Sequence, residues 1–377
     1  MTSWRQAFTT LGHKADNTFD TLRQSLEDKL GVGRDAYVRT YDWFGTADKL
    51  IVRGRALRHN GLRSPDDADG LWDNLLNSYR RFNSDEIRYA KLKVWAGDVV
   101  QEVVADDEGY FSAEIPHPTQ TPTNGWQQVN VQLIEPFSAE IAQANVRIAP
   151  ANAQIGIISD VDDTILQTFA TNLLKVAQLT FMQNAKMRLA FPGVATFYRA
   201  LQAGASGDQD NPIFYVSSSP WNLYDLLTDF IKLHDIPAGP LCLRDLGIDE
   251  DKFITTGHGS HKIEHIEQIL TTYPELPFVL IGDSGQKDPE VYAKIARRFP
   301  DRILAIYIRD VTNGERDMAV VGISAEINTP MLLTETTENA AQHALHLHLI
   351  NQAQFEEVRA AVQKADPSLD EVLNTDG

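Results

Sequence analysis

The second half of the chain alternates short apolar segments with longer amphipathic ones, and this alternation limits the fold more than any other feature. Short apolar segments are typical of buried strands, and apolar residues at every third or fourth position are typical of helices. The expected strands are 155–159, 213–216, 240–243, 278–281 and 303–308, and the expected helices are 193–203, 223–233, 262–272 and 290–298. Such an order predicts a parallel sheet covered by helices on both faces, and hence an α/β domain at residues 150–330.

The chain on either side of this domain shows other patterns. Residues 1–48 contain apolar positions with helical spacing over residues 3–30, which predicts an N-terminal amphipathic helix. Residues 49–149 contain short strand-like segments separated by turn residues, such as Ala96-Gly97-Asp98, and they predict a small β-sandwich-like accessory domain. Residues 331–377 are expected to form a C-terminal helix followed by an acidic tail.

Charge and cysteine content exclude several classes of protein. The net charge of −18 argues against binding to nucleic acid through charge attraction. The single cysteine, Cys242, has no partner for an intrachain disulfide. No apolar run approaches the roughly 18 residues of a transmembrane helix, and the first residues lack the apolar core of a secretory signal. We therefore expect a soluble cytoplasmic protein, and nothing in the sequence indicates its oligomeric state.

Polar residues follow three of the expected strands at the point where each strand ends. Asp160-Val161-Asp162-Asp163-Thr164 follows the first strand, Ser217-Ser218-Ser219 the second, and Gly282-Asp283 with Asp288 the fourth. Lys262 opens the helix that precedes the fourth strand. Open α/β sheets bind their ligands at the carboxyl ends of the strands. We therefore expect these residues to meet at one edge of the sheet.

This combination of residue types suits phosphoryl transfer, which depends on positioning and on charge neutralisation. Mg²⁺ prefers oxygen ligands, usually one or two carboxylates with water and phosphate, and Asp160 and Asp283 would supply the carboxylates. A carboxylate can also attack phosphorus and form an aspartyl phosphate. Asp160 and Asp162 point to the same side of an extended segment, so that one would attack while the other protonates the leaving alkoxide. Ser217 and Lys262 would bind the phosphate oxygens.

These motifs resemble those of a known group of enzymes. The Asp160-to-Thr164 motif, Ser217, Lys262 and the segment 282–288 are similar to the four motifs of the haloacid-dehalogenase phosphatase superfamily. Segments 158–165, 190–194, 215–223 and 281–292 resemble, more closely, the actin-patch-type phosphatidate phosphatase catalytic-domain family. The resemblance covers about residues 150–310, whereas residues 1–149 resemble the family only in architecture. It implies a haloacid-dehalogenase Rossmann-like parallel sheet with a small cap or none.

The resemblance also implies roles for the acidic residues. Asp160 would be the nucleophile and Asp162 the general acid and base. Mg²⁺ would be bound by Asp160, by the backbone carbonyl of Asp162 and by Asp283. Asp288 would complete the metal site by contacting these ligands or by binding metal-bound water. Thr164 would hold the loop or donate a hydrogen bond to Asp160.

The remaining site residues are expected to contact the substrate. Ser217 and Lys262 would bind the phosphate, and Ser218 and His261, their neighbours in the sequence, would lie beside it. The resemblance implies a Mg²⁺-dependent phosphatase that converts a phosphatidate-like lipid into diacylglycerol and phosphate.

Two alternatives stay open. One is a phosphatase that acts on a soluble phosphate ester, and the other is a non-catalytic module that binds phosphatidate. The presence of both Asp160 and Asp162 argues against the second. A lipid substrate would require a transient, peripheral contact with a membrane surface, for which the basic residues between Lys49 and Lys93 are the expected contact.

Overall fold

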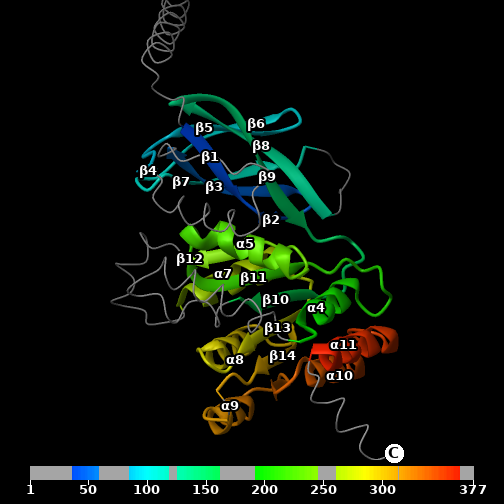
Figure 1. Ribbon diagram of the computed structural model, residues 1–377. Helices are drawn as coiled ribbons and strands as arrows, with labels where there is room; N and C mark the ends of the chain where they lie inside the picture. Colours follow the sequence, from blue (N-terminus) through cyan, green and yellow to red (C-terminus); the bar gives the residue numbers. More distant parts are fainter. Residues whose placement is uncertain are drawn as a thin grey trace, which may run out of the picture.

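The computed structural model describes residues 36–58, 85–118, 125–161, 192–244, 260–312 and 314–365. They form a β-rich part, which ends near residue 148, and an α/β part that begins at residue 156 (Figure 1). The helix expected over residues 3–30 and the acidic tail after residue 365 lie outside the described residues.

The β-rich part consists of two sheets. In the first, β3 (Lys49–Arg58) pairs antiparallel with β1 (Ala36–Tyr41), β4 (Asp85–Glu86) and β7 (Tyr110–Pro116). The second has the order β2 (Trp43–Gly45), β9 (Phe137–Ile148), β8 (Gly125–Glu135), β5 (Lys91–Ala96) and β6 (Val99–Val104). Alternate residues of both sheets meet in one apolar core, which contains Val52 and Ile115 of the first sheet and Leu92 and Val131 of the second.

In this part, the structure confirms one expectation from the sequence and corrects another. The hairpin expected around Ala96-Gly97-Asp98 is present, since β5 and β6 pair antiparallel and Gly97 has a φ of 57°, a backbone conformation that favours glycine. The β-rich part starts earlier than residue 49, because β1 and β2 already belong to its sheets. Strand β2 has only three residues, and half of the residues of β1 are only partly buried, so the apolar pattern of both strands is weak.

The α/β part contains one parallel sheet, as the alternation of strands and helices predicts. Its order is β12 (Leu241–Arg244), β11 (Ile213–Pro220), β10 (Gly156–Asp160), β13 (Phe278–Asp283), β14 (Ile303–Arg309) and β15 (Met331–Thr334). Five of these strands correspond to the five expected ones. The sixth, β15, is a four-residue edge strand with two residues only partly buried, and the sequence did not single it out.

Helices lie on both faces of this sheet. They are α4 (Val194–Ala203), η2 (Trp221–Leu223), α5 (Tyr224–Leu233), α7 (Ser260–Thr272), α8 (Asp288–Arg298), α9 (Asp317–Ser324), α10 (Thr337–His346) and α11 (Gln352–Ala365). Successive side chains of a strand point to opposite faces. Ser159 of β10 contacts Tyr198 of α4, and the next residue, Asp160, contacts Lys262 of α7, so α4 and α7 cover opposite faces.

The segment expected to form a single C-terminal helix contains β15 and then two helices, α10 and α11. Among the described residues, no helix combines the length and the apolar character needed to cross a membrane.

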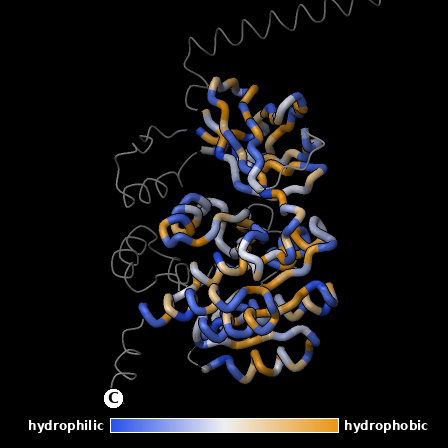
Figure 2. The backbone as a smooth tube through the Cα atoms, turned by 90° about the vertical axis from the view of Figure 1, so that its right-hand side faces the viewer, coloured by the Kyte–Doolittle hydropathy of each residue, from blue (hydrophilic) through white to orange (hydrophobic). Residues whose placement is uncertain are grey.

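Apolar residues join the β-rich part to the α/β part. Tyr41, Trp43 and Phe44 belong to the same core cluster as the strands of the parallel sheet. The ring of Tyr41 stacks on Trp221 at a centroid distance of 4.3 Å, and the Tyr224 hydroxyl accepts the backbone N–H of Asp42 at 2.7 Å. Hydrophobic residues line the interior strands in both parts (Figure 2). The first strands of the β-rich part therefore pack directly against η2 and α5.

Candidate active site

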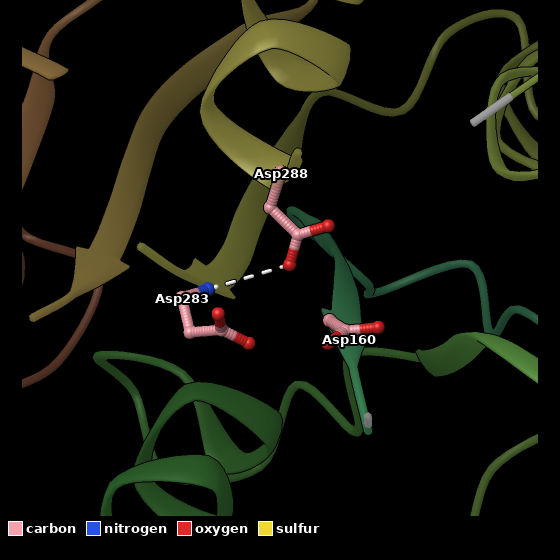
Figure 3. A group of neighbouring side chains, drawn as sticks. All are labelled: Asp160, Asp283 and Asp288. Atoms are coloured by element: carbon pink, nitrogen blue, oxygen red, sulfur yellow. Dashed lines mark hydrogen bonds between the residues drawn. The ribbon is translucent and has the colours of Figure 1, made fainter. Parts of the chain in front are cut away.

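Three carboxylates meet at the carboxyl edge of the parallel sheet. β10 and β13 are parallel neighbours with Ser159 opposite Ile281, so Asp160 and Asp283 end adjacent strands. Asp288 opens α8 directly after the loop that follows β13. One ligand atom from each of the three residues lies within 4.8 Å of the others (Figure 3). The strand order therefore brings Asp160 close to Asp283 and Asp288, which follow it by more than 120 positions in the chain, as the sequence predicts for Asp160 and Asp283.

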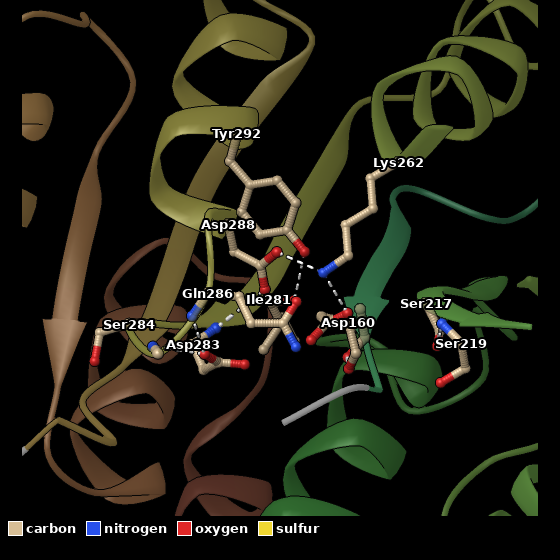
Figure 4. Close-up of polar contacts among 12 residues, drawn as sticks. Asp160, Ser217, Ser219, Lys262, Ile281, Asp283, Ser284, Gln286, Asp288 and Tyr292 are labelled. Atoms are coloured by element: carbon tan, nitrogen blue, oxygen red, sulfur yellow. Dashed lines mark hydrogen bonds and ion pairs between the residues drawn. The ribbon is translucent and has the colours of Figure 1, made fainter. Parts of the chain in front are cut away.

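Lys262 lies between two of these carboxylates. Its Nζ is 2.7 Å from Asp160 Oδ1 and 2.7 Å from Asp288 Oδ1 (Figure 4). The three side chains are almost completely buried, with 4%, 3% and 1% of their surfaces exposed. Buried charges are stable only when they are paired and hydrogen-bonded, so Lys262 and the carboxylates depend on one another.

Asp288 connects this ion pair to the β13 strand end. Its Oδ1 accepts from Lys262, and its Oδ2 accepts the backbone N–H of Asp283 at 3.3 Å. Both of its oxygens thus have protein partners. Asp288 also stands in the first turn of α8, where the helix dipole favours an acidic side chain. Asp288 is therefore linked to Asp160 through Lys262 and to Asp283 through its backbone N–H.

A tight loop fixes the carboxylate of Asp283. Its Oδ1 accepts the backbone N–H groups of Gly285 at 2.7 Å and Gln286 at 3.2 Å. Gly282 is required beside it, because a Cβ at that position would lie 2.5 Å from Asp288 Oδ2 and 2.8 Å from Cε2 of Tyr292. The side chain of Asp283 is therefore oriented by its own loop before any ligand binds.

Two tyrosines, which sequence patterns alone did not single out, brace the ends of β10 and β13. The Tyr292 hydroxyl donates to the carbonyl of Ile281 at 2.9 Å, and the Tyr198 hydroxyl lies 2.6 Å from Ser159 Oγ, which itself donates to the carbonyl of Asp160 at 2.8 Å. Burial raises the pKa of Tyr198 to about 12. Burial and the nearby Asp288 carboxylate raise the pKa of Tyr292 well above its ordinary value. Both hydroxyls therefore stay protonated at neutral pH.

The serines expected at the site lie on the opposite side of Asp160 from Asp283. Asp160 pairs with Val216 in the sheet, so Ser217 follows at the same edge (Figure 4). Ser217 is fully buried, and its Oγ accepts the backbone N–H of Ser219 at 2.9 Å. Ser218 is half-buried. The order along the edge is thus Ser217, Asp160 and Asp283.

His261 stands next to Lys262 in the first turn of α7 and is half-buried. It is four residues from His265, so the two histidines share a face of the helix. His265 is half-buried, and its ring lies 6.2 Å from the ring of Trp43 in the β-rich part. Burial, followed by the charges of Arg53 and His261, lowers the pKa of His265 to about 4. The contact of His261 with a substrate stays a prediction.

Two expected site residues fall outside the described part of the chain. Asp162 and Thr164 belong to segment 162–191, which also contains the expected cap region and Asp163. Their proposed roles as general acid and base and as a loop residue stay predictions.

Comparisons with known proteins address the same region. Residues 155–310 match a family model described as "Phosphatidate phosphatase APP1, catalytic domain". The chain is 36% identical over 164 residues to the phosphatidate phosphatase APP1 of Saccharomyces cerevisiae, a match that covers 44% of this chain and 27% of that protein. It is 29% identical over 248 residues to an uncharacterized protein of Schizosaccharomyces pombe, which covers 63% of this chain and 40% of that protein. The matches span less than half the length of both relatives.

A comparison with solved structures was also made. A carbohydrate acetylesterase from Xanthomonas citri aligns with 86% of this chain and 72% of its own at a TM-score of 0.26 and 10% sequence identity. Asp160, Ser217, Lys262, Asp283 and Asp288 all lie within the region that matches the family model.

Proposed function

Because residues 155–310 belong to the family of the phosphatidate phosphatase APP1 catalytic domain, we propose that this chain is a Mg²⁺-dependent phosphatase of phosphatidate-like lipids. The observation that carries the proposal is the contact of Lys262 with both Asp160 and Asp288, next to Asp283. A nucleophilic carboxylate, a buried cation and a second strand-end carboxylate are the groups that phosphoryl transfer requires.

The residues present fit a magnesium ion. The cluster offers only carboxylate oxygens, with ligand atoms within 4.8 Å of one another, and Mg²⁺ prefers such hard oxygen donors. Asp160 and Asp283 would hold the ion with the backbone carbonyl of Asp162. Asp288, whose oxygens bond Lys262 and the Asp283 N–H, would support them. Bound Mg²⁺ would neutralise the phosphate oxygens and hold the phosphate in line for attack.

The chemistry would proceed in two steps on the protein's own residues. In the first step, a carboxylate oxygen of Asp160 attacks phosphorus, an aspartyl phosphate forms, and the bond from phosphorus to the lipid oxygen breaks. The leaving alkoxide takes a proton from Asp162 and departs as diacylglycerol. In the second step, Asp162 removes a proton from water, the water oxygen attacks phosphorus, and Asp160 is restored as inorganic phosphate leaves.

Lys262 and Ser217 would serve the phosphate in both steps. Lys262 bonds the Asp160 carboxylate at 2.7 Å, and its positive charge would attract the phosphate oxygens. Ser217 lies at the next strand end, where its Oγ accepts the Ser219 N–H, and its hydroxyl group would donate to a phosphate oxygen. Ser218 and His261 would contact the substrate at the two sides of this edge.

A lipid substrate would also require transient contact with a membrane surface. The basic residues of the β-rich part are the proposed contact, but several are already paired. Lys49 bonds Glu114 at 2.9 Å and Lys91 bonds Glu135 at 3.1 Å. The local positive charge is thus smaller than the sequence alone indicates, and any such contact would be weak.

The decisive experiment measures phosphate release from short-chain phosphatidate by the wild-type protein and by Asp160→Asn. We expect wild-type activity that disappears in EDTA and returns with Mg²⁺, and no turnover by Asp160→Asn at unchanged secondary structure. Lysophosphatidate and soluble sugar phosphates, tested in parallel, separate a lipid phosphatase from one that acts on soluble esters. Appreciable hydrolysis by Asp160→Asn would contradict the assigned nucleophile, and activity in EDTA would contradict the metal.

A further inference from the structure

The loop 283–288 is held from outside by the segment that joins β14 to α9. Arg316, the last residue before α9, donates from Nη1 to the carbonyl oxygen of Ser284 at 2.9 Å and to the carbonyl oxygen of Gln286. Its Nη2 forms an ion pair with Glu290 in the first turn of α8. One guanidinium group therefore connects two carbonyls of this loop with the helix that follows it.

The contact with Ser284 bears directly on Asp283. The carbonyl of Ser284 and the N–H of Gly285 belong to the same planar peptide group and point in opposite directions. Arg316 bonds the carbonyl, and Asp283 Oδ1 accepts the N–H at 2.7 Å. Rotation of this peptide group would break both bonds. Arg316 thus fixes the peptide that orients the Asp283 carboxylate.

Arg316 is itself anchored to its own segment. Its backbone N–H donates to Thr312 Oγ1 at 3.3 Å, and Thr312 Oγ1 donates to Asp310 Oδ1 at 2.9 Å. The Ser284 hydroxyl donates to the same Asp310 oxygen at 3.1 Å. The side chain of Arg316 is 26% exposed. These hydrogen bonds link the segment 310–316 to loop 283–288 at two places, and they fix the position of Arg316 relative to that loop.

We propose that Arg316 is a positioning residue that sets the affinity of the carboxylate cluster for a divalent cation by holding the peptide group beside Asp283. Within the described part of the chain, the guanidinium of Arg316 contacts two backbone carbonyls and Glu290, and it makes no hydrogen bond to an oxygen of the three carboxylates. The inference rests on the metal site of the proposed function.

Charge and geometry make opposite predictions for the loss of Arg316. Removal of a positive charge near the three carboxylates would strengthen cation binding by simple electrostatics. Loss of the bonds to Ser284 and Gln286 would free the loop and weaken binding, since groups that orient metal ligands affect affinity strongly. The sign of the change therefore separates a positioning role from a charge effect.

The test is Mg²⁺ binding, measured by isothermal titration calorimetry on the full chain without substrate. We expect Arg316→Met to weaken Mg²⁺ binding by about 10-fold. Arg316→Lys keeps the charge but lacks the planar fork that bonds two carbonyls, so it should also weaken binding. Arg297→Met is the matched control, because Arg297 forms an ion pair with Glu326 at the opposite end of α8, away from loop 283–288. It should bind Mg²⁺ as the wild type does.

The outcomes separate this inference from the proposed function. Wild-type binding together with equal or tighter binding by Arg316→Met would overturn the positioning role and leave the proposed function standing. A wild-type protein that binds no Mg²⁺ would overturn the metal site and the inference with it. If Arg316→Met loses the wild-type circular dichroism spectrum, Arg316→Lys decides, and unchanged affinity in that variant overturns the inference.

Discussion

Lys262 Nζ lies 2.7 Å from Asp160 Oδ1, although 102 residues separate the two in the chain. The helix α7 brings this ammonium group to the end of β10, where the same group also reaches Asp288. The ammonium group of Lys262 is the centre of the polar site, because it bonds both Asp160, the proposed nucleophile, and Asp288, which bonds the end of β13. Its removal is therefore the most informative single change at the site.

Lys262→Met should destabilise the protein and disable it. The variant leaves Asp160 and Asp288 buried without their ammonium partner, and removing one member of a buried ion pair costs about 3 kcal/mol or more. We expect the free energy of unfolding in EDTA, measured in urea, to fall by about this amount. Phosphate release should fall by at least about 100-fold, the effect of losing one strong donor at a reacting group.

Lys294→Met provides the control for this variant. Lys294 is exposed on α8, and substitutions at such surface positions usually change stability by about 0.5 kcal/mol or less. A Lys262→Met protein as stable in EDTA as Lys294→Met would show that the buried contacts contribute little.

Gly282→Ala should disturb the site by contact alone. The added Cβ would lie 2.5 Å from Asp288 Oδ2 and 2.8 Å from Tyr292 Cε2, and both neighbours are buried. Overpacking of this kind typically costs about 1–3 kcal/mol. We expect a lower urea midpoint and slower phosphate release, because Asp288 must move away from Asp283 or Lys262.

Gly322→Ala is the matched comparison. Gly322 is exposed within α9, and a Cβ there would meet nothing within 4 Å. Since alanine favours helix over glycine by about 1 kcal/mol, this variant should be slightly more stable and fully active. Equal effects of the two alanines on activity would argue that Gly282 has no special role at the site.

The sequence predicts the edge of the sheet well because strand ends are local features. Asp160, Ser217 and Asp283 each follow an apolar run, and parallel pairing necessarily brings such ends together. Lys262 is also found at the expected place, since the helix before β13 starts at the same edge.

The hydrogen bonds that hold the strand ends and the loop of the site could not be predicted, because they depend on which distant side chain reaches which strand or loop. Tyr198 bonds Ser159 from α4, and Arg316 bonds Ser284 from a turn 32 residues further along the chain. Neither spacing follows a local period. Strands β1, β2 and β15 were missed for another reason. Strand β2 has only three residues, and half of the residues of β1 and of β15 are only partly buried, so their apolar patterns are weak.

Trp43→Ala tests the connection between the β-rich part and the α/β part. Trp43 is completely buried, lies 4.1 Å below the guanidinium of Arg53, and belongs to the core cluster of the parallel sheet. Truncation of a buried tryptophan costs about 3–5 kcal/mol. We expect the free energy of unfolding to fall by this amount, with both parts losing stability in one transition.

Two observations would check this prediction. Val100→Ala, at a position on β6 that is 53% exposed, should stay within about 0.5 kcal/mol of the wild type. A Trp43→Ala protein whose α/β part unfolds at the wild-type urea concentration, followed by the fluorescence of Trp221, would show that the two parts are energetically independent.

His265 should make stability depend on pH below neutrality. Burial is the main cause that lowers its pKa to about 4, from an ordinary value of 6.5. Between these values the unfolded chain binds a proton that the folded protein does not. The contribution of the neutral His265 to the free energy of unfolding is therefore fully present above pH 6.5, and it is lost as the pH falls toward 4. One such group contributes at most about 1.4 kcal/mol per pH unit, or roughly 3 kcal/mol over the whole interval.

His265→Asn isolates this contribution from that of the carboxylates, which titrate in the same range. Urea unfolding of the wild type and the variant between pH 4 and pH 8 gives the difference in their free energies of unfolding. We expect the stability advantage of the wild type to shrink as the pH falls, because only the wild type has a histidine that takes up its proton more readily in the unfolded chain than in the folded protein. The exposed His346→Asn variant controls for the loss of a histidine as such and should follow the wild-type curve. A difference between wild type and His265→Asn that does not change with pH would mean that His265 accepts its proton equally in the folded and unfolded states.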